Sequence, residues 1–122
     1  MTVTFDTSAW IEYFLGSEIG QLSRSYVDGD EPIITSAISI MEIKDKYLRE
    51  GKRWQDRISL ISERSEIIVV DDKLAILAAD MKRDHHLHSM DALIYATSQA
   101  VKSKLLTKDA HFKDLKDVII LA

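Results

Sequence analysis

Short apolar runs alternate along the chain with longer segments in which apolar residues recur every three or four positions. Five runs rich in β-branched residues predict strands, at residues 3–5, 33–35, 67–70, 105–107 and 118–121. Helical spacing appears between them in three sets: Ile40, Ile43 and Tyr47; Leu74, Leu77, Ala78 and Met81; Met90, Ile94, Thr97 and Val101. Strands that alternate with helices predict an α/β fold in which helices cover both faces of a mostly parallel sheet.

One helical segment carries a stripe of small residues, Ala92, Ala96 and Ala100. Residues four positions apart share one face of a helix, so this face can approach the sheet closely. We interpret the stripe as ordinary core packing.

Composition narrows the possible functions. The 122 residues include only four Gly and one Pro, and no low-complexity tract, which predicts a single domain over residues 1–122. Sixteen Lys plus Arg against twenty Asp plus Glu give a net charge of -4, so no overall positive field attracts a polyanion. Contact with nucleic acid must therefore be local or metal-mediated. The absence of Cys excludes disulfides, Cys-ligated zinc and thiol nucleophiles.

The start of the chain has neither the basic region nor the apolar stretch of a signal peptide. The longest apolar runs fall far short of the roughly 20 residues that cross a bilayer. We therefore expect a cytoplasmic protein with no membrane partner.

Four acidic residues occur where the predicted elements would bring them together. Asp6 follows the first strand and Asp109 follows the fourth. Glu42 is expected in the first turn of the helix after the second strand, and Asp91 in the first turn of the helix before the fourth. Parallel sheets bind ligands in the crevice outside the carboxyl ends of their strands, so these four acids are candidates for a shared site.

Each acid also has a purely structural interpretation. Asp6 and Asp109 are suitable helix N-caps, and Asp91 complements a helix dipole. Ser39 and Glu42 have the spacing of a capping box, and Glu42 can also pair with Lys46 four residues on. With twenty acids in the chain, spacing alone does not decide between capping and chemistry.

The residues around the four acids form four short segments, which are 3–10 (VTFDTSAW), 36–42 (SAISIME), 90–98 (MDALIYATS) and 105–112 (LLTKDAHF). These segments resemble the four motifs of the PIN-domain ribonucleases, in the same order and over nearly the whole chain. Within that family, the short length of the chain and its single predicted domain most resemble those of the VapC toxins of type II toxin–antitoxin pairs. The resemblance implies a five-stranded parallel sheet between helices, a homodimer, and a small antitoxin protein that lays a C-terminal segment, with an Arg or Lys aimed at the acids, across the active-site groove.

The resemblance also implies a site for RNA hydrolysis. Asp6, Glu42 and Asp91 match the family's acidic positions, Asp109 matches the most variable one, and Ser8 and Thr107 match polar positions near the metal. Four carboxylates brought together repel one another unless a cation binds among them, and oxygen ligands suit Mg²⁺ or Mn²⁺. We expect one or two ions, an in-line phosphodiester displacement and products with 5′-phosphate and 3′-hydroxyl ends.

The densest basic stretch offers candidate contacts to the RNA backbone. It comprises Lys44, Lys46, Arg49, Lys52 and Arg53. Phosphate contacts position a strand without reading its sequence, and single-stranded or loop RNA is the expected form of the substrate. The alternative is a solvated helix face with ion pairs such as Asp45 with Arg49.

Two alternative functions remain open from the sequence. A PIN-like fold that only binds, with the acids retained as caps, is the non-catalytic alternative. Asp71 and Asp72 are similar to the acidic pair of Mg²⁺-binding receiver domains, but they follow the third strand and precede a capped helix start.

Two further groups have structural and functional interpretations. The histidine-rich segment has the residue type of a zinc or nickel site, but with no Cys and no evident fourth ligand we expect a solvated turn between helices. His111 is a candidate phosphate contact, and we expect a surface residue. The apolar first helix either contacts a partner or packs into the core. The residues concerned are His85, His86 and His88, and Trp10, Tyr13, Phe14 and Leu15.

Overall fold

The computed structural model describes residues 1–122, and all five predicted strands are present in one sheet. The strands are β1 (Val3–Phe5), β2 (Ile33–Ser36), β3 (Glu66–Ile68), β4 (Lys104–Thr107) and β5 (Val118–Ile120). Their order in the sheet is β3-β2-β1-β4-β5, and every pair is parallel. The prediction of an α/β fold with a five-stranded parallel sheet is therefore confirmed.

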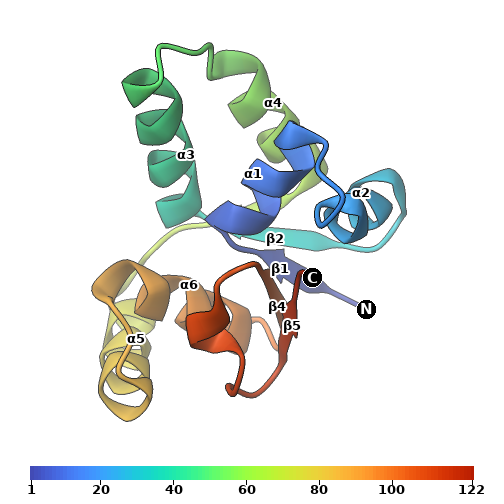
Figure 1. The fold of residues 1–122 in the computed structure, drawn as a ribbon. Helices are drawn as coiled ribbons and strands as arrows, with labels where there is room; N and C mark the ends of the chain where they lie inside the picture. Colours follow the sequence, from blue (N-terminus) through green and yellow to red (C-terminus); the bar gives the residue numbers. More distant parts are fainter.

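Helices cover both faces of the sheet (Figure 1). One face carries α1 (Thr7–Leu15), α2 (Gln21–Asp28), α3 (Ala37–Arg49) and α4 (Gln55–Arg64). The other carries α5 (Asp72–His85), α6 (Ser89–Ala100) and the short 3₁₀ helix η1 (Ala110–Phe112). None of these helices has both the length and the apolar character that spanning a membrane requires.

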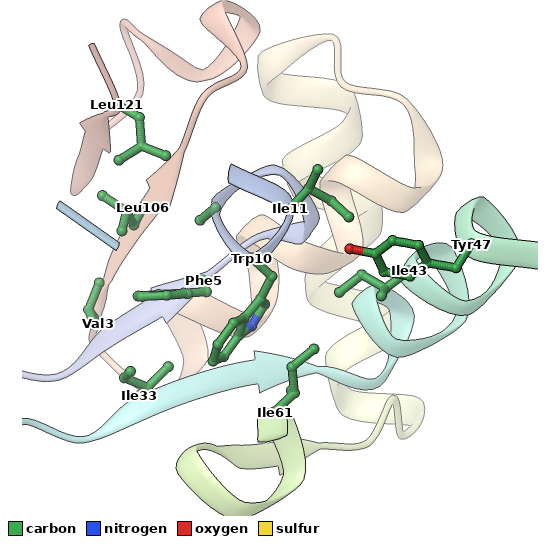
Figure 2. Packing of buried hydrophobic residues seen from close by; sticks show 11 residues of the cluster. Val3, Phe5, Trp10, Ile11, Ile33, Ile43, Tyr47, Ile61, Leu106 and Leu121 are labelled. Atoms are coloured by element: carbon green, nitrogen blue, oxygen red, sulfur yellow. The ribbon is translucent and has the colours of Figure 1, made fainter. Parts of the chain in front are cut away.

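The core on the first face is built around Trp10 of α1. Its ring lies 4.7 Å from that of Phe5, and its Nε1 donates a hydrogen bond of 3.0 Å to Oγ1 of Thr35. Figure 2 shows this indole among side chains from the strands and from α3 and α4. The apolar first helix thus packs mainly into the chain's own core, whereas Leu15 at its end stays 63% exposed.

The core on the second face rests on α6. Ala92 and Ala96 are buried, as the alanine stripe predicts, but Ala100 is exposed because α6 ends there. Met90 is also exposed, at the second position of the helix. The predicted buried face is therefore wrong at both ends of α6, where the helix extends past the neighbours that would cover it.

The third strand is shorter and earlier than its apolar run predicts. It pairs with β2 from Glu66 to Ile68, and the chain leaves the sheet at Val69, which is 69% exposed. β3 is an edge strand with one neighbour, so an apolar run there receives less cover than in the centre.

Candidate active site

The four predicted acids line one hollow at the carboxyl ends of β1 and β4. Strand order reverses at β1, since its neighbours β2 and β4 come from different halves of the chain, and ligands bind at such a switch point. The hollow has a volume of about 270 Å³. Its lining residues are Asp6, Thr7, Ser8, Ile11, Glu12, Glu42, Asp91, Ile94, Lys108 and Asp109.

Asp6 is buried, and donors from the start of α1 and from the end of β4 hold its carboxylate. Its Oδ1 accepts hydrogen bonds from Ser8 Oγ at 2.6 Å and from the backbone N of Ala9 at 2.8 Å. Its Oδ2 accepts one from the hydroxyl of Thr107 on β4. Asp6 is thus the N-cap of α1 and a member of the acidic cluster at once, so the structural and the functional interpretations both apply.

Burial dominates the ionisation of Asp6. It raises the pKa of Asp6 from the ordinary value of 3.8 to about 6, against the opposing effect of the hydrogen bonds from Ser8, Thr107 and Ala9. The negative charge of Asp109 adds to the rise in this pKa. Near neutral pH the fold therefore holds a carboxylate whose charge is poorly compensated by protein alone.

Glu42 reaches the hollow from α3 and is anchored to α1. Thr7 Oγ1 donates to Glu42 Oε1 at 2.5 Å and lies 3.2 Å from Ser39 Oγ. The predicted capping box is wrong, because Ser36 is the N-cap of α3 and accepts from the backbone N of Ile38. This earlier start places Glu42 in the second turn of the helix rather than the first.

Asp91 and Asp109 form the outer wall of the hollow. Asp91 lies in the first turn of α6, as predicted, and burial together with the charge of Asp109 raises its pKa, while His88 and His111 lower it. Asp109 caps η1, and its Oδ1 lies 2.9 Å from both the backbone N and Nδ1 of His111. Two imidazoles therefore stand at the rim of the acidic cluster.

Sequence reasoning missed three of the polar residues that line the hollow: Thr7, Glu12 and Lys108. Glu12 lies one helical turn after Ser8, so helical spacing from Asp6 and Ser8 is a signal that could have found it. Lys108 stands between two residues already singled out, but nothing in its position indicates where the side chain points.

The predicted basic stretch lies outside this hollow. Lys46 pairs with Glu50 at 2.5 Å and Arg49 with Asp45 at 2.9 Å. Lys44 lies over the ring of Trp54, 4.2 Å from its centroid. Lys52 also pairs with Glu50, and Arg53 is exposed. Most of these cations are thus engaged with neighbours on α3 and the segment after it.

The predicted histidine-rich turn between α5 and α6 is present, but His85 is the last residue of α5 and lies before it. His86 is the C-cap of α5, with a φ of 56°, and His88 is the N-cap of α6. His85 packs edge-on against Tyr95. Asp71 caps α5 by accepting from the backbone N of Leu74 at 2.8 Å, which confirms the expected helix start after β3.

Comparison with known proteins identifies the family. The sequence profile of the PIN domain matches residues 3–118. The chain belongs to the PIN domain family. No curated protein matches the sequence. Among solved structures, this PIN domain is similar to a toxin–antitoxin complex from Klebsiella pneumoniae, with a TM-score of 0.83, 21% identity and coverage of 98% of each chain.

Two further solved structures share the fold of this PIN domain. One is VapBC2 from Rickettsia felis bound to a DNA fragment from its promoter, with a TM-score of 0.78, 17% identity and coverage of 98% and 97% of the two chains. The other is Mycobacterium tuberculosis VapC20, a toxin that cleaves the sarcin–ricin loop, with a TM-score of 0.75, 15% identity and coverage of 98% and 99%.

The donor set of the PIN domain fits a partly hydrated divalent cation. All four acids offer oxygen ligands, and burial and the charge of Asp109 raise the pKa of both Asp6 and Asp91, a penalty that a cation would relieve. No three side chains of the ligand-forming types lie close enough together to hold an ion directly. Mg²⁺ keeps several waters and commonly binds only one or two carboxylates, so this looser arrangement suits it.

Proposed function

We propose that this PIN domain is a metal-dependent endoribonuclease that hydrolyses phosphodiester bonds in RNA. The observation that carries the proposal is Asp6, a carboxylate buried to 6% exposure at the switch point, with Glu42, Asp91 and Asp109 around the same hollow. A fold that needed only a helix cap at Asp6 would have no reason to gather three more acids beside it.

Mg²⁺ or Mn²⁺ is the proposed cofactor, as one or two ions. Asp6, Glu42 and Asp91 would hold it directly or through water, and Asp109 would bind a second ion or orient the attacking water. When bound, the cation supplies an activated water and neutralises charge on the scissile phosphate.

The residues around the acids keep them in place for this chemistry. Ser8 and Thr107 direct both oxygens of Asp6, and Thr7 directs Glu42 across from α1 to α3. Loss of a group that fixes a metal ligand in this way typically lowers metal affinity by roughly 10- to 100-fold. His111 fixes Asp109 from outside.

The biological role we propose is that of a toxin held inactive by a small antitoxin protein that covers the hollow and presents an Arg or Lys to the acids. Support comes from the likeness to toxin–antitoxin complexes and from the excess negative charge of the hollow. A homodimer is part of the proposal, since Met41 and Leu48 leave exposed apolar side chains on one face of α3.

The test is cleavage of a mixed RNA panel in Mg²⁺, in Mn²⁺ and in EDTA by the native protein and by Asp91→Asn. Asp91 stands apart from the hydrogen bonds that hold Asp6, so its substitution removes charge with little effect on the fold. We expect metal-dependent cleavage and roughly a thousand-fold loss of rate in the variant, the equivalent of several kcal/mol of transition-state stabilisation.

The matched control is Asp56→Asn, which removes an exposed acid from the first turn of α4, outside the hollow. It should cleave as the native protein does. Equal cleavage by all three proteins would indicate a contaminating nuclease. If none cleaves and Mn²⁺ fails to raise the melting temperature, the chain is a non-catalytic binding module, because a ligand of the native state must stabilise it.

A further inference from the structure

Lys108 is the one cationic side chain that lines the acidic hollow. All the other charged residues lining it are acidic: Asp6, Glu12, Glu42, Asp91 and Asp109. RNA brings further negative charge into this hollow. A bound metal ion would neutralise charge on the phosphate that is cut, but the neighbouring phosphates of the strand would still lie next to carboxylates.

The backbone of Lys108 is fixed by the same network that holds Asp6. Its N donates a hydrogen bond of 2.8 Å to Ser8 Oγ, and Ser8 in turn donates to Asp6. Thr107, which precedes it, donates to Asp6, and the N of Asp109, which follows it, donates to Thr107 Oγ1 at 2.9 Å. Hydrogen bonds to the residues that hold Asp6 therefore fix the backbone from which the Lys108 side chain extends.

The far end of the side chain is held by Glu12 of α1. Nζ of Lys108 lies 3.3 Å from Glu12 Oε2, while the lysine side chain stays 51% exposed. An ammonium has three donors, and its hydrogen bond to Glu12 uses one of them. Lys108 thus presents charge and donor capacity toward the hollow.

The side chain of Glu12 is itself held in place by its surroundings. Its side chain is only 8% exposed, and Oε1 accepts from Ser17 Oγ at 2.9 Å. The loop after α1 closes over it: a Cβ on Gly20 would lie 2.4 Å from the carbonyl oxygen of Glu12, so glycine is needed for this approach. Burying a carboxylate is costly unless it is paired, and the Ser17 hydroxyl and Lys108 are the partners that pair it.

We propose that Lys108 binds a backbone phosphate of the RNA strand next to the phosphate that is cut, and that Glu12 is the positioning residue that holds the ammonium over the hollow. This inference rests on the proposed nuclease function. Lys108 acts on the bound strand in ground state and transition state alike, so it contributes to KM rather than to kcat.

The test compares Lys108→Met with Lys104→Met. Both remove one exposed lysine charge, but Lys104 begins β4 and lies at the opposite end of the strand that leads to Lys108. Binding of a fluorescein-labelled single-stranded RNA of mixed sequence is followed by anisotropy over a salt series, and cleavage of the same RNA gives KM and kcat.

We expect Lys108→Met to weaken binding roughly three- to tenfold and to reduce the slope of log affinity against log salt by about 0.7, the value for one phosphate contact on a single strand. KM should rise with little change in kcat. Lys104→Met should leave all of these quantities at native values, and Lys108→Arg should retain most of the affinity because the charge is kept.

Glu12→Gln sharpens the test of positioning. It should weaken RNA binding less than Lys108→Met does, and it should have no further effect when Lys108 is already Met. A merely structural ion pair would change the melting temperature of these variants but not the salt slope. An unchanged slope in Lys108→Met, or equal effects of Lys108→Met and Lys104→Met, would overturn the proposal.

The outcomes separate this inference from the proposed function. If the native protein cleaves RNA with metal but Lys108→Met binds and cleaves like it, the inference alone fails. If the native protein binds RNA with a slope that depends on Lys108 but cleaves nothing in Mg²⁺ or Mn²⁺, the nuclease function fails and the phosphate contact stands.

Discussion

Buried side chains bridge β1 and β4 at both ends of the pair, with a neutral contact at one end and a charged contact at the other. At the amino end, Thr4 Oγ1 and Ser103 Oγ lie 2.5 Å apart, both buried, and Ser103 also donates to the carbonyl of Ser98. At the carboxyl end, Thr107 donates to Asp6, again between two buried side chains. Each bridge joins residues about a hundred positions apart, but the first is neutral and the second includes a carboxylate.

The side chains around the two bridges also differ in charge. Lys102, Lys104 and Lys116 line the hollow at the amino end, whereas acids dominate the hollow at the carboxyl end. A neutral hydroxyl pair already stabilises the junction of these strands. The carboxylate at the other end is costly to the fold because burial raises its pKa, and this cost agrees with the metal site that we propose there.

The largest expected effect is on the pH dependence of metal-free stability. Asp6 has a folded pKa of about 6 against 3.8 unfolded, so between these values the fold keeps a proton that the unfolded chain has lost. The contribution of Asp6 to the free energy of unfolding is therefore greatest below pH 3.8 and declines as the pH rises toward 6. The total decline is about 3 kcal/mol, at about 1.4 kcal/mol per pKa unit.

Denaturant unfolding in EDTA from pH 4 to pH 7 measures this effect as the difference between the native protein and Asp6→Asn. The variant should lack the decline, and added Mn²⁺ should reverse it in the native protein alone, because the ion binds the charged form. Parallel pH profiles for the two proteins would show that Asp6 titrates as an ordinary surface acid.

Thr107→Val should have the next largest effect. It removes the donor to Asp6 Oδ2 and the acceptor for the N of Asp109 with little change in volume. We expect Mn²⁺ affinity to fall roughly 10- to 100-fold, as for other groups that orient a metal ligand. Thermal-shift titration with Mn²⁺ measures this, and a native affinity would contradict the orienting role.

Ser103→Ala should have the smallest effect. It removes the neutral bridge to Thr4 and the hydrogen bond to the carbonyl of Ser98, and we expect a loss of about 1 to 2 kcal/mol of unfolding free energy for these two buried hydrogen bonds. The loss should be the same at pH 4 and at pH 7, and Mn²⁺ affinity should be native. A pH-dependent loss would mean that the two ends of the sheet are coupled rather than independent.

Most of the fold could be predicted from the sequence because periodicity reports which face of an element is buried. The runs that became β1, β2 and β4 lie in the middle of the sheet, where apolar character and cover coincide. Prediction failed at edges: β3 stops before Val69, and Ala100 and Met90 extend past the core. Local pattern cannot show where a neighbouring element ends.

The acids were predictable as a group from their place beside strands and from the motifs around them. The residues that form hydrogen bonds and ion pairs at this site were harder to predict. Ser8 and Thr107 were found by resemblance, but Thr7 and Glu12 act through contacts that depend on how α1 meets α3 and β4. The N-cap of α3 shows the same limit: it is Ser36 rather than Ser39, and the two serines have equal capping chemistry.

The separation of Asp6 and Thr107 by 101 positions has a consequence for synthesis on the ribosome. Asp6 emerges 101 residues before Thr107 on β4, the strand that helps to bury it. Until β4 arrives, β1 is a bare sheet edge and its terminal carboxylate remains in water with an ordinary proton affinity. The nascent chain is therefore unable to assemble the acidic hollow before β4 and the residues that follow it have been translated.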